Sequence, residues 1–249
     1  LIDKNILEKI SSAVKIEKDT EILEIGPGTG NLTEYLIKKN PSKIFLIEKD
    51  KNLVELLKKK FNKDVNIFNE DFLDFSNKNS LGKNLLIFGN LPYNISSQVL
   101  VKLIINKEKF VFKRMIFMFQ KEMADRIISE ENSKHYGRLS ILTSWKFNIN
   151  KITDVNPNSF YPKPKVKSSL LIFEPKNNFF KFKKAESLEY VTRVFFNQRR
   201  KKIKKPIKIL FKNKIDLEKK LNLDLNLRPQ NISPKIFFEI TKEYENLIG

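Results

Sequence analysis

Three of the seven glycines in this chain, Gly26, Gly28 and Gly30, lie within five positions, directly after a short apolar run that ends at Ile25. Glycine allows positive φ where a strand turns into a helix, and it lets backbone N–H groups approach a ligand closely. The N-terminus of the helix beyond such a turn favours polar or anionic groups. The segment therefore predicts a strand, a tight turn and a helix, which form either a plain connection or a ligand-binding loop.

The first 175 residues alternate short apolar runs with amphipathic stretches, which is typical of a parallel sheet covered by helices. Strand-like runs stop after Pro175, and apolar residues then recur at helical spacing among many lysines. We therefore predict an α/β domain over residues 1–178 and a small all-helical domain over residues 179–249. The seven expected strands, mostly parallel, are residues 22–25, 44–47, 65–68, 85–88, 115–119, 147–155 and 168–173.

The chain of 249 residues has a formal net charge of +19, of which residues 176–249 carry +11. Nucleic acid is the usual partner of a protein with such an excess of positive charge, and an anionic membrane surface is the second most usual. Lysine, asparagine, isoleucine and phenylalanine are all abundant and have AT-rich codons, so genome composition could also raise the charge. The concentration of charge in the final third favours a nucleic-acid contact there.

The chain contains no cysteine, which excludes disulfides, thiolate metal sites and a cysteine nucleophile, and this fits a cytoplasmic protein. No apolar run approaches the roughly 18 residues of a membrane span. The single histidine, His135, supports neither a metal cluster nor a Ser-His-Asp triad. We expect no metal and no membrane association, and we expect natural residues to precede Leu1, since the chain does not begin with Met.

The glycine spacing departs from the dinucleotide-binding pattern, which needs a glycine three residues after the second one. Asn31 stands at that position, and Gly30 follows Gly28 by only two residues. Glu24 precedes the turn, and an acid there suits the amino-acid end of S-adenosylmethionine better than a pyrophosphate. The loop therefore predicts an S-adenosylmethionine site.

Two further acids follow the next predicted strands. Glu48 ends the second strand, twenty residues after Gly28, where a carboxylate can accept both ribose hydroxyls. Asp71 follows the third strand, where it either binds the adenine amine of the cofactor or is a solvated surface acid. Because the carboxyl ends of parallel strands meet at one edge of a sheet, we expect Glu24, Glu48 and Asp71 to face one crevice.

The tetrapeptide Asn90-Leu91-Pro92-Tyr93 follows the fourth predicted strand. It could be a simple turn. An asparagine side chain, a fixed turn and an aromatic ring are also what an enzyme needs to bind a flat, amine-bearing base. Its position after the fourth strand, downstream of a cofactor loop, favours the base-binding hypothesis.

Together, residues 24–30, Glu48, Asp71 and residues 90–93 resemble the ordered motifs of class I methyltransferases that modify adenine N6. Three longer segments, residues 120–140, 160–168 and 196–201, narrow the resemblance to the bacterial small-subunit (16S) rRNA adenine N6,N6-dimethyltransferases. The resemblance covers essentially the whole chain. It implies a Rossmann-like sheet, S-adenosylmethionine as the cofactor, and dimethylation of two adjacent adenines near the 3′ end of the rRNA, with a role in subunit maturation.

The resemblance also implies partners and site residues. The substrate is small-subunit rRNA within an immature 30S particle, and the enzyme is expected to be a cytoplasmic monomer. Relatives have an N-terminal Gln-x-Phe-Leu segment that helps cover the cofactor, of which Leu1 remains here. The expected cofactor-binding residues are Leu1, Glu24, Gly26, Gly28, Gly30, Glu48, Asp71 and Asn90.

In the catalytic arrangement that the family implies, the Asn90 side-chain oxygen and the Leu91 carbonyl each accept a hydrogen from adenine N6. These bonds hold the amine toward a pyramidal geometry and aim its lone pair at the methyl group. Pro92 fixes φ and helps to present the carbonyl. Tyr93 is expected to stack on the base and Phe160 to close its other face, each worth roughly 1–3 kcal/mol.

The second half contains six charges in seven positions. They form either a solvated helix face or a contact with RNA phosphates, which would make binding steeply salt-dependent. We predict the phosphate contact for Arg199, Arg200, Lys201, Lys202, Lys204 and Lys205.

Two alternatives remain at this point. The sister family that methylates large-subunit rRNA and gives macrolide resistance shares the glycine loop and a similar Asn-x-Pro-aromatic motif, although residues 136–140 and 196–201 favour the small-subunit family. A ribosome-assembly factor with secondary catalysis is the other alternative. A DNA adenine methyltransferase is disfavoured, since those enzymes usually carry proline at the position of Leu91.

Overall fold

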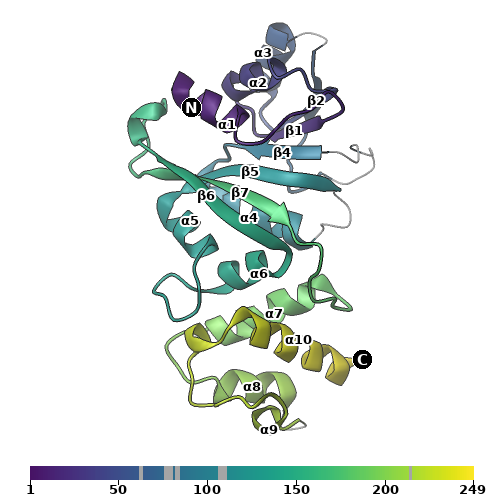
Figure 1. Ribbon diagram of the computed structural model, residues 1–249, viewed down its shortest axis with the longest axis vertical. Coiled ribbons are helices and arrows are strands. Elements are labelled where there is room, and N and C mark those ends of the chain that lie inside the picture. Colours follow the sequence, from purple (N-terminus) through teal and green to yellow (C-terminus); the bar gives the residue numbers. More distant parts are fainter. Residues whose placement is uncertain (62–63, 76–80, 82–84, 106–110, 213–214) are drawn as a thin grey trace. The chain divides into compact units, whose positions relative to one another are not determined.

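A computed structural model describes the chain except for residues 62–63, 76–80, 82–84, 106–110 and 213–214 and the side chain of Tyr93 (Figure 1). The chain forms two compact units. The first comprises Leu1–Ala124 and Ile149–Pro175, and the second comprises Asp125–Asn148 and Lys176–Gly249.

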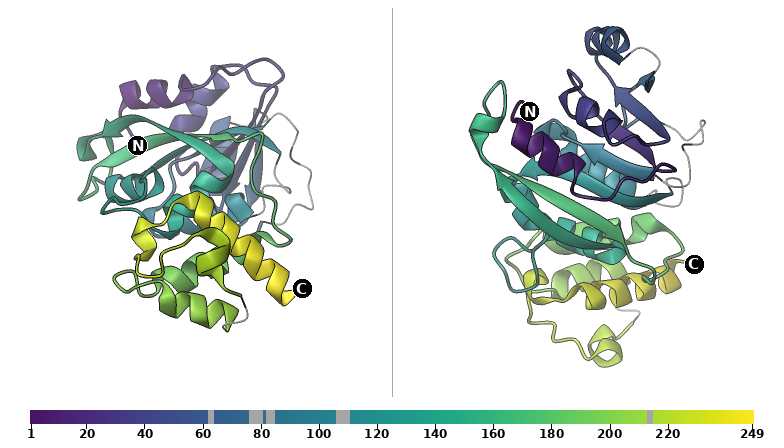
Figure 2. Two further views of the ribbon diagram at one scale, coloured as in Figure 1. Left: turned by 60° about the horizontal axis from the view of Figure 1, so that its bottom comes forward. Right: turned by 45° about the horizontal axis from the view of Figure 1, so that its top comes forward.

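The described residues include a seven-stranded sheet of order β3-β2-β1-β4-β5-β7-β6. Figure 2 gives two further views of the ribbon. The pairs β1–β2, β1–β4, β2–β3 and β4–β5 are parallel, whereas β7 runs antiparallel to β5. The seven predicted strands and the mostly parallel sheet are thus confirmed. The strands are β1 (Glu21–Ile25), β2 (Lys43–Glu48), β3 (Asn66–Asn69), β4 (Leu85–Gly89), β5 (Phe112–Gln120), β6 (Phe147–Val155) and β7 (Ser168–Pro175).

The burial of each strand follows from its place in the sheet. Every residue of the central strand β4 is buried. Both faces of such a parallel strand are covered, and its sequence is therefore a continuous apolar run. The outer strands β3 and β6 keep several residues exposed. Sequence patterning therefore located the central strands most clearly.

Helices of the first unit pack against the sheet. They are α1 (Lys4–Ser11), α2 (Asn31–Ile37), α3 (Lys51–Phe61), α4 (Tyr93–Ile105) and the start of α5 (Lys121–Ile127). Apolar side chains of the first three share one core cluster with alternate residues of the central strands, among them Leu7, Leu36, Leu57, Leu86 and Phe88. The Asp3 carboxylate caps α1 by accepting from the backbone N–H groups of Asn5 and Ile6.

The second unit is helical in its described residues. Its helices are α6 (Arg138–Lys146), α7 (Ala185–Phe196), α8 (Lys204–Phe211), α9 (Leu217–Leu221) and α10 (Pro234–Ile248), with a 3₁₀ turn at Pro229–Asn231. Helix α7 contacts α6, α8 and α10. The rings of Phe195 and Phe237 meet edge to face with centroids 5.2 Å apart, at the buried contact of α7 with α10.

Residues 125–148 group with the C-terminal helices, whereas the sequence prediction placed all of residues 1–178 in the first domain. Two buried aromatic residues are the physical reason. The Tyr136 hydroxyl donates to the Ile232 carbonyl at 2.8 Å, and the Trp145 indole N–H donates to the Phe180 carbonyl at 2.7 Å. The two carbonyl partners lie 96 and 35 positions away along the chain, so no local sequence pattern predicts these hydrogen bonds.

Candidate cofactor and substrate site

The glycine-rich segment forms the predicted turn. Gly26, Gly28 and Gly30 have φ values of +66°, +60° and +76°, in the left-handed region that favours glycine. The Gly26 N–H donates to the Ile47 carbonyl of β2 at 2.9 Å, and the Gly30 N–H closes the turn on the Pro27 carbonyl at 3.0 Å. The loop therefore leads from β1 into the N-terminus of α2 with its backbone fixed at both ends.

The three glycines differ in the space around them, which gives a first prediction. A Cβ on Gly30 would lie 2.4 Å from a ring carbon of Phe61, whereas a Cβ on Gly28 meets nothing within 4 Å. We expect Gly30→Ala to lower the free energy of unfolding by about 2–3 kcal/mol, from left-handed strain plus overpacking. Gly28→Ala should lower it by about 1 kcal/mol, from strain alone. Urea unfolding of both variants checks this, and equal losses would contradict it.

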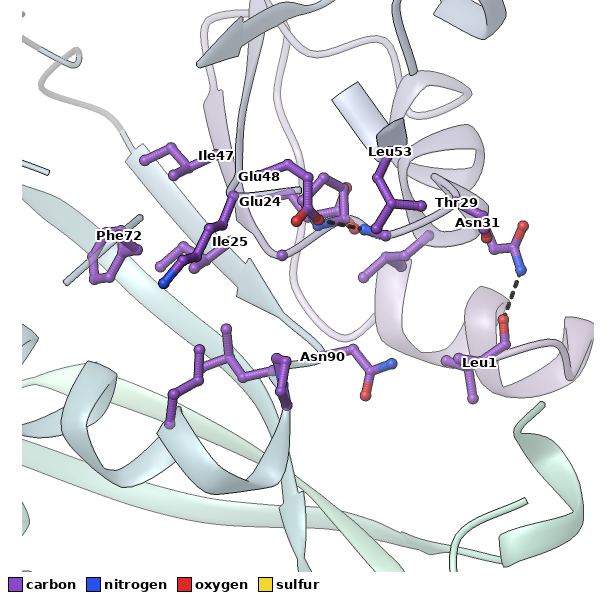
Figure 3. A pocket seen from close by; sticks show the side chains of 18 of the residues that line it. Leu1, Glu24, Ile25, Thr29, Asn31, Ile47, Glu48, Leu53, Phe72 and Asn90 are labelled. Carbon is purple, nitrogen blue, oxygen red and sulfur yellow. Dashed lines mark hydrogen bonds between the residues drawn. The ribbon is translucent and has the colours of Figure 1, made fainter. Parts of the chain in front are cut away.

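A cavity of about 370 Å³ opens at the carboxyl ends of β1, β2 and β4. Figure 3 shows how side chains from these strand ends surround it. The predicted cofactor residues that line it are Leu1, Glu24, Gly26, Gly28, Glu48, Asp71 and Asn90; its other lining residues include Asn31, Leu53, Phe72, Leu91, Pro92 and Tyr161. Gly30 does not line it, because its Cα faces Phe61 behind the turn.

Glu24 is buried at the end of β1, with 2% of its surface exposed. The Thr33 hydroxyl of α2 donates to its Oε2 at 2.6 Å. Burial raises the pKa of Glu24 to about 7; the neighbouring charge of Glu48 adds to this rise, and the Thr33 hydrogen bond opposes it. The carboxyl group can therefore gain or lose a proton near neutral pH.

Glu48 ends β2 and is held against the glycine turn. Its Oε2 accepts from the Gly28 N–H at 3.1 Å, and its Oε1 accepts from the Asp50 N–H at 3.1 Å. Figure 3 shows its carboxylate next to the turn. A carboxylate fixed in this way has lone pairs left for a pair of hydroxyl groups.

Asp71 follows β3. Its Oδ2 pairs with the Lys49 ammonium at 2.8 Å, and its Oδ1 accepts from the Leu73 N–H at 2.9 Å. The hydrogen bond from Lys49, aided by that from Leu73, lowers the pKa of Asp71. The residue therefore presents an ionised acceptor beside Phe72 at this end of the cavity.

Leu91 lies against the glycine turn, and Asn90 lines the same cavity. A Cβ on Gly26 would stand 3.8 Å from Cδ2 of Leu91, whose side chain is 2% exposed. The Asn90 side chain points into the cavity (Figure 3). The Pro92 carbonyl accepts from the N–H groups of Ile95 and Ser96, which begins α4. One cleft thus joins the tetrapeptide to the turn, as the sequence hypothesis requires; the side chain of Tyr93 lies outside the described residues.

Leu1 closes another side of the cavity and is tied down by its neighbours. Its carbonyl accepts from the Asn31 side-chain amide at 2.8 Å. The Ile2 N–H donates to the Ser159 carbonyl at 2.9 Å, and the Ser159 hydroxyl donates to the Asp3 carboxylate at 2.9 Å. The first residues and the loop after β6 are therefore held together.

Phe160 and Tyr161 are placed differently from each other. Phe160 is 9% exposed, belongs to the core cluster of the first unit and is not among the residues that line the cavity. Tyr161 is 82% exposed and lines it. The sequence reasoning missed Tyr161; the available signal was a second aromatic residue directly before Pro162, on a loop where one of two adjacent side chains must face outward.

The six residues of the predicted phosphate contact are not equally available. Arg199 is half-buried, and its guanidinium donates to the Lys134 carbonyl. The Lys202 ammonium donates to the Asn226 side-chain oxygen at 2.8 Å. Arg200, Lys201, Lys204 and Lys205 are exposed around the start of α8, and Lys202 is exposed as well.

The described part of the chain holds no group of three or more His, Cys, Asp or Glu residues that could bind a metal ion. None of its helices combines the length and the apolar character needed to cross a membrane.

A mostly parallel seven-stranded sheet whose strand-end cavity joins a glycine turn to an Asn-Leu-Pro motif defines a class I S-adenosylmethionine-dependent methyltransferase. The family model for ribosomal RNA adenine dimethylase matches residues 1–246. The chain belongs to the ribosomal RNA adenine dimethylase family.

Known proteins agree with this assignment. The chain is 53% identical to the ribosomal RNA small subunit methyltransferase A of Pelagibacter ubique, over all of this chain and 95% of that one. It resembles the crystal structure of a dimethyladenosine transferase from Plasmodium falciparum, with a TM-score of 0.83 and 27% identity over 99% of this chain and 97% of that one. It shares the fold of the 23S rRNA methyltransferase ErmE, with a TM-score of 0.71 and 20% identity over 99% of both chains.

The residues of the cavity fit S-adenosylmethionine, the cofactor of this class. The carboxylates of Glu24, Glu48 and Asp71 can accept hydrogen bonds from the ammonium, hydroxyl and amine groups that the cofactor carries. The space beside Gly28 is open, so a ligand can approach the backbone there. Leu53 and Phe72 supply apolar surface.

Proposed function

We propose that this protein dimethylates N6 of two adjacent adenines near the 3′ end of small-subunit rRNA. Its substrate is the rRNA within an immature 30S particle, and the enzyme acts in the cytoplasm as a monomer. The observation that carries the proposal is that Asn90 and Leu91 line one cavity together with the glycine turn, against which Leu91 packs, in a chain that belongs to this family.

The lining of the cavity supports these cofactor-binding roles. Glu24 would bind the amino-acid end, Glu48 would accept the ribose hydroxyls and Asp71 would accept the adenine amine, while Gly26 and Gly28 would give the ligand access to the backbone. Leu1 and Gly30 act indirectly, Leu1 as part of the cover and Gly30 by closing the turn. When bound, the sulfonium supplies an activated methyl group, so alignment and electrostatics supply most of the rate enhancement.

The target adenine must leave its helix or come from a loop to reach the cavity. The Asn90 oxygen and the Leu91 carbonyl then accept the two N6 hydrogens, and Pro92 holds that carbonyl in place. Stacking by Tyr93 and Phe160 stays a prediction, and the core position of Phe160 weighs against it in this arrangement of the loop. Tyr161, exposed at the cavity, offers a further ring for the base or its neighbour.

The second compact unit supports RNA contact through its charge. We propose that residues 179–249 form a small RNA-contacting domain, with Arg199, Arg200, Lys201, Lys202, Lys204 and Lys205 near the phosphates. Arg199 and Lys202 also stabilise the local fold through the hydrogen bonds described above.

A charge-removal variant tests this contact. Changing the exposed Arg200, Lys201, Lys204 and Lys205 to glutamine should raise the Kd for 30S particles at 0.15 M salt by at least about tenfold. It should also reduce the slope of log K against log salt by roughly 3, because fewer counterions are released. Filter binding at several salt concentrations measures both quantities.

The matched control removes the same charge elsewhere in this unit, by changing Lys181, Lys219, Lys235 and Lys242, which are also exposed, to glutamine. If both variants lose the same affinity and slope, the contact is diffuse and the assignment to residues 199–205 is wrong.

The activity is tested by incubating the protein with labelled S-adenosylmethionine and either unmethylated 30S particles or 23S rRNA. We expect N6,N6-dimethyladenosine at two adjacent positions of the small-subunit rRNA, detected by mass analysis of nuclease fragments. Product on 23S rRNA alone, or on DNA, would overturn the proposal. The large-subunit alternative has no support from the shared fold, because a likeness at 20% identity does not report the substrate.

A further inference from the structure

A single helical turn after β3 forms one wall of the cofactor cavity. The N–H groups of Asp74 and Phe75 donate to the Asp71 carbonyl at 2.9 Å each, which defines the turn. Phe72 and Phe75 are 4% and 2% exposed, and their rings stack with centroids 6.4 Å apart. Asp71 and Phe72 line the cavity, so the position of this turn sets the shape of the end assigned to the cofactor adenine.

Lys102 of α4 reaches this turn from another part of the chain. Its half-buried ammonium donates to the carbonyls of Phe72, Leu73 and Phe75 at 3.0, 2.5 and 3.1 Å. It also lies 5.6 Å from the centroid of the Phe72 ring. An ammonium has three N–H donors, and three carbonyls surround this one. A cation at the carbonyl end of a helical turn is also favoured by the turn's dipole.

We propose that Lys102 is a positioning residue for cofactor recognition, which holds the turn so that Asp71 and Phe72 stand ready for the adenine of S-adenosylmethionine. The inference rests on the proposed function only in assigning the adenine to Asp71. Without the ammonium, the carbonyls of Phe72, Leu73 and Phe75 lose their shared donor. The turn can then adopt another position.

The same helix connects the two halves of the site. Helix α4 begins at Tyr93, directly after the residues proposed to bind the target amine, and Lys102 lies nine positions further on. The cavity wall for the cofactor is thus anchored on the element that follows the substrate motif. Because the carbonyls that Lys102 contacts belong to the turn that forms the cofactor wall, we expect cofactor affinity, rather than the methyl-transfer step, to depend on Lys102.

The test is Lys102→Met, which keeps the length and apolar stem of the side chain and removes its donors. Binding is measured by calorimetry with two probes, S-adenosylhomocysteine and S-inosylhomocysteine, which carries an oxygen in place of the adenine amine. We expect about tenfold weaker binding of the first probe and less than a twofold change for the second, because only the first offers an amine to Asp71. At saturating cofactor, kcat should stay within twofold of the original protein.

Two further variants serve as controls. Lys102→Arg keeps a charged donor and should recover most of the affinity. Lys176→Met removes another half-buried lysine that donates to a backbone carbonyl, that of Ser144 in the second unit, and should leave both probes unaffected.

A Lys102→Met protein that loses both probes equally, together with thermal stability, would show a purely structural lysine and overturn the inference; an unchanged affinity would do the same. Neither probe needs RNA. If Lys102→Met weakens only S-adenosylhomocysteine, as expected, but the original protein does not methylate 30S particles, the proposed function is contradicted. The role of Lys102 in cofactor binding would still stand.

Discussion

Replacing Asn90 by alanine is expected to lower kcat for adenine methylation by about 10²–10³-fold. The change removes one of the two acceptors proposed for the N6 hydrogens, and loss of one preorganised hydrogen-bonding group in an active site has effects of this size. The Asn90 side chain lines the cavity, and alanine at this position offers no acceptor. Single-turnover methylation of 30S particles at saturating cofactor measures the loss at the chemical step.

The matched control is Asn94→Ala, which changes an exposed asparagine four positions after Asn90, in the first turn of α4. It should retain activity within about twofold, as surface substitutions usually do. If Asn90→Ala keeps more than a tenth of the original kcat, the amide oxygen does not orient the amine. If methylation is lost while 30S maturation stays normal, the assembly role does not depend on the chemistry.

Glu24→Gln is expected to remove a marked pH dependence of stability. Burial raises the pKa of Glu24 to about 7 in the folded protein, whereas an unfolded glutamate titrates near 4.5. Between these two values the folded state holds a proton that the unfolded state has lost, so stability falls as pH rises from about 4.5 to 7. The full difference is about 3 kcal/mol, and the glutamine variant should be more stable than the original by up to that amount at pH 8.

Urea unfolding at pH 5, 6, 7 and 8 measures this slope for both proteins. Glutamine keeps an oxygen for the Thr33 hydroxyl, so the hydrogen bond is retained and only the charge is lost. Glu34→Gln changes a half-exposed residue of α2 that is paired with Lys60, and it should change the free energy of unfolding by less than about 1 kcal/mol. Identical slopes for Glu24→Gln and the original protein would contradict the expectation.

The same variant should bind the cofactor less well at high pH. A cationic amino-acid end favours the ionised form of Glu24, so binding to the original protein should strengthen between pH 6 and 8 as that carboxylate forms. The glutamine variant has no charge to gain and should show no such rise. Calorimetry with S-adenosylmethionine across this range separates the two cases.

Much of the site could be predicted because its parts are local patterns joined by a simple topology. Central strands such as β4 are buried on both faces and therefore appear as apolar runs, and glycines mark the turn by their spacing. Once the strands are parallel, their carboxyl ends must share an edge, which brings Glu24, Glu48 and Asp71 to one cavity although they are 24 and 23 positions apart.

By itself, the sequence determined the seven strands, the glycine turn, the three acids and the Asn-Leu-Pro motif beside them, since each depends on neighbours along the chain or on strand order. The tertiary structure decided that Phe160 packs in the core while Tyr161 faces the cavity, that Arg199 is engaged by a carbonyl, and that Lys102 anchors the cavity wall. These outcomes depend on contacts between distant segments, such as that of Ser159 with Asp3, 156 positions apart. They also depend on which of two adjacent side chains points into the core. Packing of that kind has no periodic signature, because it is set by the shape of the space that remains when distant segments meet.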